Sequence, residues 1–278
     1  MTVRLPAVAG SWYPGTAPAL SRALDAYLEG APPEPAPFDK VIAIVAPHAG
    51  FMYSGRVAGR AYQLLRRHAF DVIVLVGPSH FVAFDGVGLY PRGGFQSPLG
   101  VAPIAEDCAA AIMAASSVVR ERPSAHAREH SLEMQLPFVQ HLAPEVPIVP
   151  LLMGAQTADT AARLGEALAA GLLGRRALLV ASTDLSHYHD AATASRLDRV
   201  VLDHVARFDA DGLQRAIDAN PGHACGGGPT VAVMRAAWAL GARDAAVLDY
   251  ADSGDVSGDK SAVVGYMAAA LGSLKSEV

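Results

Sequence analysis

The sequence contains only two cysteines, Cys108 and Cys225, in 278 residues. Two cysteines form at most one disulfide, which the cytoplasm would normally keep reduced, so a disulfide-stapled scaffold is excluded. Residues 1–6 show no charged stretch leading into an apolar run and a cleavage site, and the longer apolar runs elsewhere are interrupted by Arg, Asp or Pro. We therefore predict a cytoplasmic protein without membrane association.

An excess of positive charge is also missing. The chain has 22 Lys and Arg against 27 Asp and Glu, a formal net charge of −5. Because phosphate backbones and anionic lipids attract basic surfaces, neither nucleic acid nor membrane is an expected partner. The common catalytic and metal signatures are absent as well: there is no closely spaced cysteine pair, His-Glu-x-x-His, phosphate-binding loop or Gly-x-Ser-x-Gly elbow. A site must be inferred from residues that the fold brings together.

Hydrophobic residues make up 51% of the chain, which is enough for a sizeable core. Short apolar runs, typical of strands buried on both faces, alternate with segments of helical periodicity. The predicted strands are 41–46, 72–76, 148–153, 177–181 and 245–248, and the predicted helices are 57–67, 107–115, 160–173, 193–208 and 230–240. This alternation predicts a single α/β domain over residues 1–278, with a mostly parallel central sheet flanked by helices on both faces.

Three segments depart from the alternation. Residues 84–99 are rich in Gly and Pro and indicate a hairpin or an excursion, while residues 252–259 indicate a polar turn. Residues 32–37 are rich in proline and indicate an extended connection between an N-terminal helix and the first strand of the sheet. None is long enough to be a linker, so we predict no domain boundary.

Two of the predicted strands end shortly before a histidine. Strand 41–46 runs into Pro47-His48-Ala49-Gly50, and strand 72–76 runs into Gly77-Pro78-Ser79-His80. The carboxyl ends of parallel strands meet at one edge of a sheet, where ligands gather. A single histidine in this position is more often structural, but two from separate strands favour a shared site.

A third strand, 177–181, leads into a turn with Asp184, His187 and His189. From its position alone, Asp184 is expected to cap free backbone N–H groups. In this turn His187 and His189 need not point the same way, so we expect only one of the two histidines to face the site.

Cys225 lies directly before the predicted helix that opens near Thr230 and is followed by three glycines. A helix N-terminus favours a thiolate, so this cysteine is a candidate ligand, whereas Cys108 has the surroundings of a small hydrophobe in an amphipathic helix. Two imidazoles and one thiolate would suit Fe(II), Zn(II) or copper.

A charged cluster precedes an apolar helical run that extends to Leu142. Glu129 and Glu133 are four residues apart and would share one helical face, and His130 would stand where that helix begins. The cluster is either a charged first turn or part of the site.

Six motifs in order resemble those of the Memo-like family. They are Ala9-Gly10-Ser11-Trp12-Tyr13-Pro14, Ala46-Pro47-His48-Ala49-Gly50, Gly77-Pro78-Ser79-His80, Glu129-His130-Ser131-Leu132-Glu133-Met134, Ser182-Thr183-Asp184-Leu185-Ser186-His187 and Cys225-Gly226. The likeness spans the chain from near residue 9 to near residue 267. In bacteria and archaea the family is called AmmeMemoRadiSam system protein B, and its fold is similar to that of the class III extradiol ring-cleaving dioxygenases.

The resemblance implies that His48, His80 and Cys225 bind a metal and that Asp184 and His187 are catalytic residues of the same pocket. It further implies an acid–base role for His187. The related dioxygenases complete their iron site with a glutamate, and a thiolate in its place argues against ring cleavage. Iron or copper is expected ahead of zinc.

The same motifs make His130 and Trp12 candidates for lining a substrate pocket, although Trp12 is expected rather to anchor the N-terminal segment. A small molecule or a peptide is the expected ligand of the cleft. Family context implies a radical-SAM protein and an AMMECR1-like protein as partners.

Three functions fit these residues. The first is a metal-dependent oxidoreductase, a non-heme iron or copper enzyme in which His187 moves a proton. The second is a metal-binding or partner-binding protein without turnover, and the third, weakest, is hydrolysis by zinc-activated water.

Overall fold

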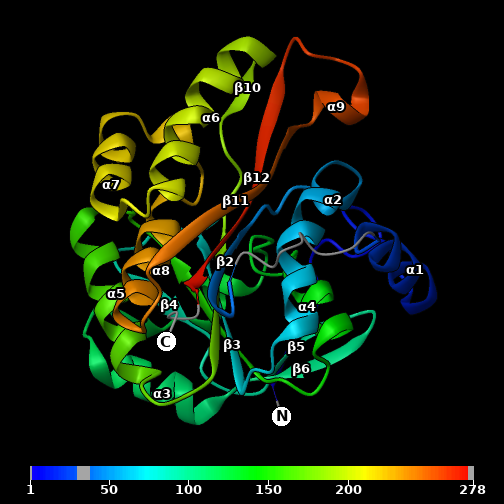
Figure 1. Cartoon of the computed structure of the whole chain (residues 1–278). Helices are drawn as coiled ribbons and strands as arrows, with labels where there is room; N and C mark the ends of the chain where they lie inside the picture. Colours follow the sequence, from blue (N-terminus) through cyan, green and yellow to red (C-terminus); the bar gives the residue numbers. More distant parts are fainter. Residues whose placement is uncertain (1, 30–37, 275–278) are drawn as a thin grey trace.

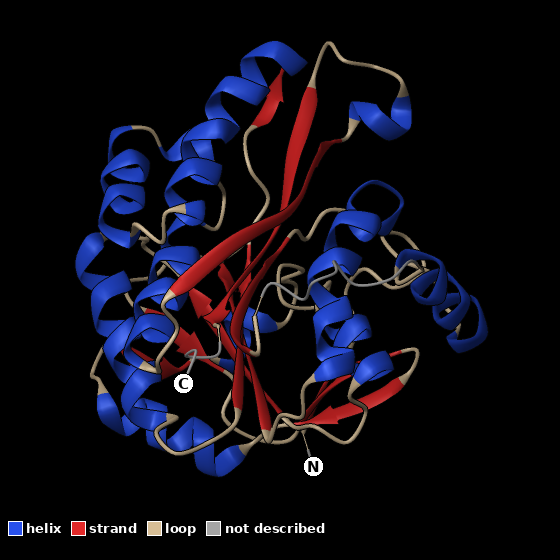
Figure 2. Cartoon of the chain, viewed as in Figure 1, coloured by secondary structure: helices blue, strands red, loops and turns tan. Residues whose placement is uncertain are grey.

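The computed structural model describes residues 2–29 and 38–274, and a large mixed sheet forms its centre (Figures 1 and 2). Within those residues the sheet has nine strands, in the order β10-β12-β2-β9-β3-β8-β4-β7 with β11 paired to β12. The strands are β2 (Lys40–Ala46), β3 (Val72–Pro78), β4 (Val87–Leu89), β7 (Val119–Glu121), β8 (Ile148–Met153), β9 (Ala177–Ser182), β10 (His187–His189), β11 (Asp244–Asp252) and β12 (Val263–Ser273).

The central strands β2, β9, β3 and β8 run parallel to one another. Their residues are buried along nearly their whole length, which explains the continuous apolar runs in the sequence. The prediction of a parallel centre is confirmed, and all four strands lie where the apolar runs predicted them.

Outside this centre the sheet is mixed. On one side β12 runs antiparallel to β2 and pairs antiparallel with β10 and β11, and on the other side β4 runs antiparallel to β8. The expectation of a mostly parallel sheet therefore holds for the centre alone. The prediction omitted β12, an 11-residue strand rich in Ala and Gly, which are uncommon in strands. It also omitted β4, β7 and β10, which have three residues each, too few to show a period of two.

Helices cover both faces of the sheet, as predicted (Figures 1 and 2). On one face α8 packs against β2, β3 and β9, and α3, α5, α7 and α6 pack around it. On the other face α2 packs against β2 and β12, and α1 and α4 cover α2. The helices are α1 (Ala17–Tyr27), α2 (Phe51–Tyr62), α3 (Glu106–Ala115), α4 (Leu136–Leu142), α5 (Ala158–Gly171), α6 (Ala191–Ala206), α7 (Ala210–Ala219), α8 (Gly227–Ala239) and α9 (Gly254–Ser257), with 3-10 turns at Gln63–Arg67, Pro123–His126 and Pro221–His223.

The irregular segments resolve into short elements. Residues 84–99 contain β4 and β5 (Gly94–Ser97), and β5 forms an antiparallel hairpin with β6 (Gly100–Pro103). A second sheet of three strands joins this hairpin to β1 (Val3–Arg4) near the N-terminus. The polar turn at 252–259 contains α9, and the proline-rich segment 32–37 lies outside the described residues. No helix in the described part of the chain is long and apolar enough to cross a membrane.

Candidate metal centre

Three side chains from the carboxyl edge of the sheet come together as predicted. His48 follows β2, His80 follows β3, and Cys225 precedes α8. One ligand atom from each lies within 4.8 Å of the other two, and the Cys225 Sγ is 3.2 Å from the His48 Nε2. The strand-end argument therefore located this cluster, while its occupation by a metal stays a prediction.

A buried hydrogen-bond network sets the orientation of the His48 ring. The Ser182 Oγ donates to the Ser131 carbonyl (2.6 Å) and accepts from the Gln135 Nε2 (2.8 Å). Its one proton is thereby used, so toward the His48 Nδ1, 2.9 Å away, it can only accept. His48 is thus protonated at Nδ1, and the Nε2 lone pair faces Cys225, as a metal ligand requires.

The His80 ring is oriented by Glu129. The Glu129 Oε1 lies 2.9 Å from the His80 Nδ1, and the Oε2 accepts the His80 backbone N–H at 2.5 Å. The backbone N–H groups of His130 and Ser131 also donate to this carboxylate. Burial alone would raise the pKa of Glu129, but the hydrogen bonds and charge of His80 and the backbone donors lower it to about 2. An ionised acceptor at Nδ1 leaves the His80 Nε2 free to bind a metal.

The prediction that Glu129 and Glu133 share one helical face is wrong. Helix α4 begins only at Leu136, and His130 lies six residues before it rather than at its start. Glu129 binds the N–H groups of the next two residues, a local bonding pattern that competes with a helix.

Glu133 holds the N-terminal segment instead of capping a helix. Its fully buried carboxylate forms an ion pair with Arg4 and accepts the Tyr13 hydroxyl at 2.7 Å. It also accepts the backbone N–H groups of Ala7 and Val8 at 2.7 and 3.0 Å. The buried aromatic anchor of this segment is therefore Tyr13.

Cys225 is fixed by backbone contacts on both sides. Its N–H donates to the Asp184 carbonyl, and its Sγ accepts the Asp184 N–H at 3.3 Å. The Gln156 side chain bridges the Cys225 carbonyl (2.7 Å) and the Gly228 N–H (2.8 Å), which ties the cysteine to the first turn of α8. Sequence reasoning missed Gln156, because nothing local relates a residue after β8 to this turn.

The Cys225 thiol does not have the protonation state that its position before a helix predicted. Burial raises the pKa of Cys225, and the Asp184 carboxylate adds to the rise, so the expected thiolate at a helix N-terminus is not what these surroundings favour without a metal. Burial and the nearby imidazoles of His80 and His130 hold the pKa of His48 well below its usual range. The imidazole is neutral and ready to bind a metal, and the thiol would lose its proton on binding.

Asp184 accepts backbone N–H groups, but these groups belong to the loop after β2 and not to the turn that carries Asp184. Its Oδ1 accepts the His48 N–H at 2.7 Å, and the carboxylate also accepts from Ala49. Burial raises its pKa to about 7, although those two hydrogen bonds oppose the rise. Asp184 thereby joins the turn after β9 to the loop that carries His48.

The two histidines of β10 have different environments. His189 is exposed, whereas His187 is partly buried and its Nε2 is shielded from solvent without a hydrogen-bond partner in the described structure. Burial lowers the pKa of His187, and the charge of His80 lowers it further. His187 is therefore a neutral base close to the candidate ligands.

Aromatic rings border the centre. The His130 ring stacks on His80 with centroids 4.7 Å apart, and the Trp12 ring lies 4.4 Å from His130. Trp12 is 37% exposed and Phe81, beside His130, is 50% exposed. His80, Glu129 and His130 also form a second ligand-like group, but the Glu129 oxygens already accept hydrogen bonds, so we assign this carboxylate to orienting His80.

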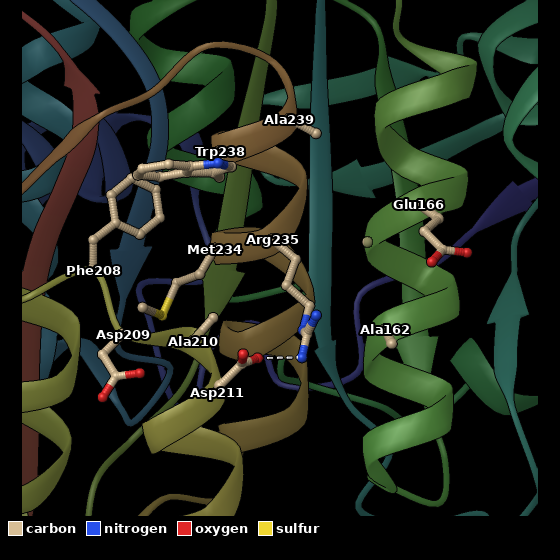
Figure 3. A pocket seen from close by; sticks show the side chains of 11 residues that line it. Ala162, Glu166, Phe208, Asp209, Ala210, Asp211, Met234, Arg235, Trp238 and Ala239 are labelled. Atoms are coloured by element: carbon tan, nitrogen blue, oxygen red, sulfur yellow. Dashed lines mark hydrogen bonds and ion pairs between the residues drawn. The ribbon is translucent and has the colours of Figure 1, made fainter.

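Two hollows lie near the centre. One, of 670 Å³, is lined by Cys225 and Gln156, and another, of 470 Å³, is lined by Ser79 and Val82 next to His80. A third, of 390 Å³, contains none of the predicted residues (Figure 3). It lies at the end of α8 remote from Cys225, where Trp238 stands over Phe208 and Arg235 pairs with Asp211.

Cys108 is buried in α3, as expected for a small hydrophobe.

Comparisons with known proteins agree with the motifs. The family model described as Memo-like protein matches residues 4–270. The chain is 37% identical to a MEMO1 family protein of Methanothermobacter thermautotrophicus, over 95% of this chain and 98% of that protein. It is 38% identical to a MEMO1 family protein of Methanosarcina acetivorans, over 96% and 98%.

Among solved structures, an uncharacterized protein of Escherichia coli K12 shares the fold, with a TM-score of 0.58 and 15% identity over 82% of this chain and 99% of that one. The family match covers nearly the whole chain, and its range includes all six motifs. The chain therefore belongs to the Memo-like family.

Proposed function

We propose that the chain binds one transition metal ion through His48, His80 and Cys225 and acts as a metal-dependent oxidoreductase on a small molecule or peptide. The observation that carries the proposal is the paired orientation of the two imidazoles. The Ser182 network and Glu129 each hold one ring nitrogen, so that both Nε2 atoms are left for a metal beside the Cys225 sulfur.

The donor set suits a redox metal. Two imidazoles and one thiolate are soft enough for copper and also bind iron, which we expect ahead of zinc. Bound there, the metal would supply one-electron chemistry to an oxidisable ligand. With zinc the same three donors would resemble a hydrolytic site, and an esterase, phosphatase and amidase screen on zinc-loaded protein tests that weaker possibility.

His187 is the proposed acid–base residue. Its Nε2 lies out of solvent and has no hydrogen-bond partner among the described residues, and burial keeps the ring neutral at pH 7. A neutral imidazole of this kind can take a proton from a ligand and return it. Asp184 supports the same pocket by fixing the backbone of His48, and its carboxylate adds a second buried ionisable group.

The exposed Trp12 ring and the His130 ring are proposed to line the ligand's path to the centre. Radical-SAM and AMMECR1-like proteins are the proposed macromolecular partners, by family context. No contact in the structure bears on them, so co-purification is the direct test.

A second candidate is a metal-binding or partner-binding protein without turnover. The observation that favours it is the thiol itself, because cysteine is more easily oxidised than the carboxylate of a ring-cleaving enzyme. Oxygen consumption with a panel of catechols and other reductants separates the two candidates: sustained uptake supports the oxidoreductase, and none across the panel supports the binding protein.

Metal content measured by mass spectrometry on untagged protein, purified without chelators, tests the proposal. We expect near-stoichiometric iron or copper in the wild type and its loss in Cys225→Ser and His48→Ala. Cys108→Ser and His189→Ala are matched controls that should keep the metal, and His187→Ala should keep the metal but lose turnover. Absence of metal in the wild type, even after anaerobic reconstitution, would overturn the proposal.

A further inference from the structure

The segment that carries His187 has little regular structure of its own. Strand β10 has three residues, and its register against β12 shifts between His187 and His189. Between them Tyr188 has a φ of +63°, in the left-handed region that side-chain-bearing residues rarely adopt, and it is 77% exposed. A backbone conformation of this kind persists only where surrounding contacts impose it.

Two hydrogen bonds to β12 supply part of that constraint. The Leu185 N–H donates to the Gly265 carbonyl at 2.8 Å, and the Gly265 N–H donates to the Ser186 carbonyl at 3.0 Å. The next donor, the Ser186 N–H, does not bond to the backbone of β12. It donates to the Asp198 Oδ1 on α6 at 2.8 Å.

Asp198 is unusual for a helix residue because it is completely buried. Its Oδ2 accepts the Tyr250 hydroxyl from β11 at 2.8 Å, so the carboxylate joins α6, β11 and the His187 segment. The fold makes room for it at Gly265, where an added Cβ would lie 2.0 Å from the Asp198 Oδ2. A buried carboxylate is costly to maintain, and its hydrogen bonds to Ser186 and Tyr250 both fix the surroundings of His187.

We infer that Asp198 is a positioning residue, which holds Ser186 and thereby sets the place of the His187 imidazole at the candidate centre. The acid–base role of His187 belongs to the proposed function, and the inference rests on that role. The experiment that tests the position of His187 does not depend on it. Asp198 touches none of the candidate ligands in the described contacts. Its loss should therefore move His187 and leave His48, His80 and Cys225 in place.

Leucine is the informative replacement, because it keeps the branched shape of the side chain and removes both acceptor oxygens. Asparagine is the conservative variant, because its amide oxygen can accept the Ser186 N–H while its amide nitrogen donates to the Tyr250 hydroxyl. Tyr250→Phe removes one of the two hydrogen bonds and leaves the carboxylate. Gly265→Ala keeps every hydrogen-bonding group and displaces the carboxylate from the strand side.

The experiment is an NMR comparison of the histidine Cε1–Hε1 signals in the full chain labelled with ¹³C-histidine, with His187 assigned from His187→Gln. In Asp198→Leu and Gly265→Ala we expect the His187 signal to shift by more than its line width or to broaden, whereas Asp198→Asn should leave it near its wild-type position. The signals of buried His126 and of His204, on the same helix as Asp198, should not move. Tyr250→Phe should give a smaller shift, and Asp203→Asn, an exposed carboxylate on the same helix, none.

A His187 signal unchanged in both Asp198→Leu and Gly265→Ala would overturn the inference and leave Asp198 as a support of the fold only. Movement of all histidine signals together would do the same, because it reports general loosening. The measurement needs no metal and no turnover. Failure of the proposed function would appear as wild-type protein without metal, which is a separate result.

Discussion

Glu129→Gln tests the oriented-imidazole argument most directly. The Glu129 carboxylate is 1% exposed and accepts the His80 Nδ1–H and three backbone N–H groups. Glutamine has the same shape, but its amide nitrogen must face at least one of these donors and its charge is lost. The substitution therefore removes the group that fixes the His80 tautomer without opening a cavity.

The pKa of Glu129 gives the size of the effect. A decrease from 4.5 in the unfolded chain to about 2 in the folded protein corresponds to about 3 kcal/mol of folding stability from the ionised carboxylate. This contribution is fully present above pH 4.5 and is lost as the pH falls through about 2. Loss of a hydrogen-bonded carboxylate behind a metal-binding histidine weakens metal binding by about 10- to 100-fold.

Two assays read these effects at pH 7. Urea unfolding of the metal-free protein should show a loss of about 2–3 kcal/mol, and chelator competition with zinc, which adds no redox chemistry, should show the weaker binding. Glu121→Gln is the control, since Glu121 pairs with Arg92 on the surface and should contribute less than about 1 kcal/mol. If Glu129→Gln binds zinc as tightly as wild type and unfolds at the same urea concentration, Glu129 does not orient His80.

Two further predictions concern buried groups outside the centre. Burial lowers the pKa of His126 to about 3, so the contribution of His126 to stability should fall by about 2 kcal/mol between pH 6.5 and 4.5, as the unfolded chain takes up the proton. Other buried groups titrate in the same range, so the test is the difference between proteins: urea unfolding at the two pH values should show a fall smaller by about 2 kcal/mol in His126→Gln than in wild type, and an equal fall would refute this assignment. Glu133→Gln should cost about 3–5 kcal/mol, because it leaves Arg4 buried without its partner charge; a melting temperature like that of Glu121→Gln would contradict the role of Glu133 as the anchor of the N-terminal segment.

The position of the candidate centre was predictable because it depends on strands that the sequence shows clearly. Strands β2 and β3 are apolar on both faces, and each ends within two residues of its histidine. Once the strands are parallel and adjacent to β9, His48 and His80 must lie at one edge. No long-range contact has to be known for that step.

The orientation of the rings could not be predicted in the same way. The Ser182 hydroxyl contacts His48 across 134 residues of sequence and Gln135 across 47, and no periodicity relates these positions. The sequence predicts a helix at Glu129 because a charged pair four residues apart precedes an apolar run. The turn that forms instead is stabilised by the carboxylate's own bonds to the backbone, an effect that spacing rules omit.

The turn from Glu129 to Gln135 accounts for much of this organisation. At every second position it carries a polar side chain with a contact of its own. Glu129 orients His80, the Ser131 hydroxyl binds the Pro78 carbonyl, Glu133 holds the N-terminal segment, and Gln135 supports Ser182 behind His48. Between them Leu132 and Met134 are buried in the core. This one short turn contacts the groups that orient both imidazoles and also the segment that bears Trp12. A backbone shift in the turn should therefore change both the metal affinity and the solvent exposure of the centre. A regular helix could not direct these four side chains to four different parts of the fold, since residues two apart on a helix point about 200° apart and those four apart share a face.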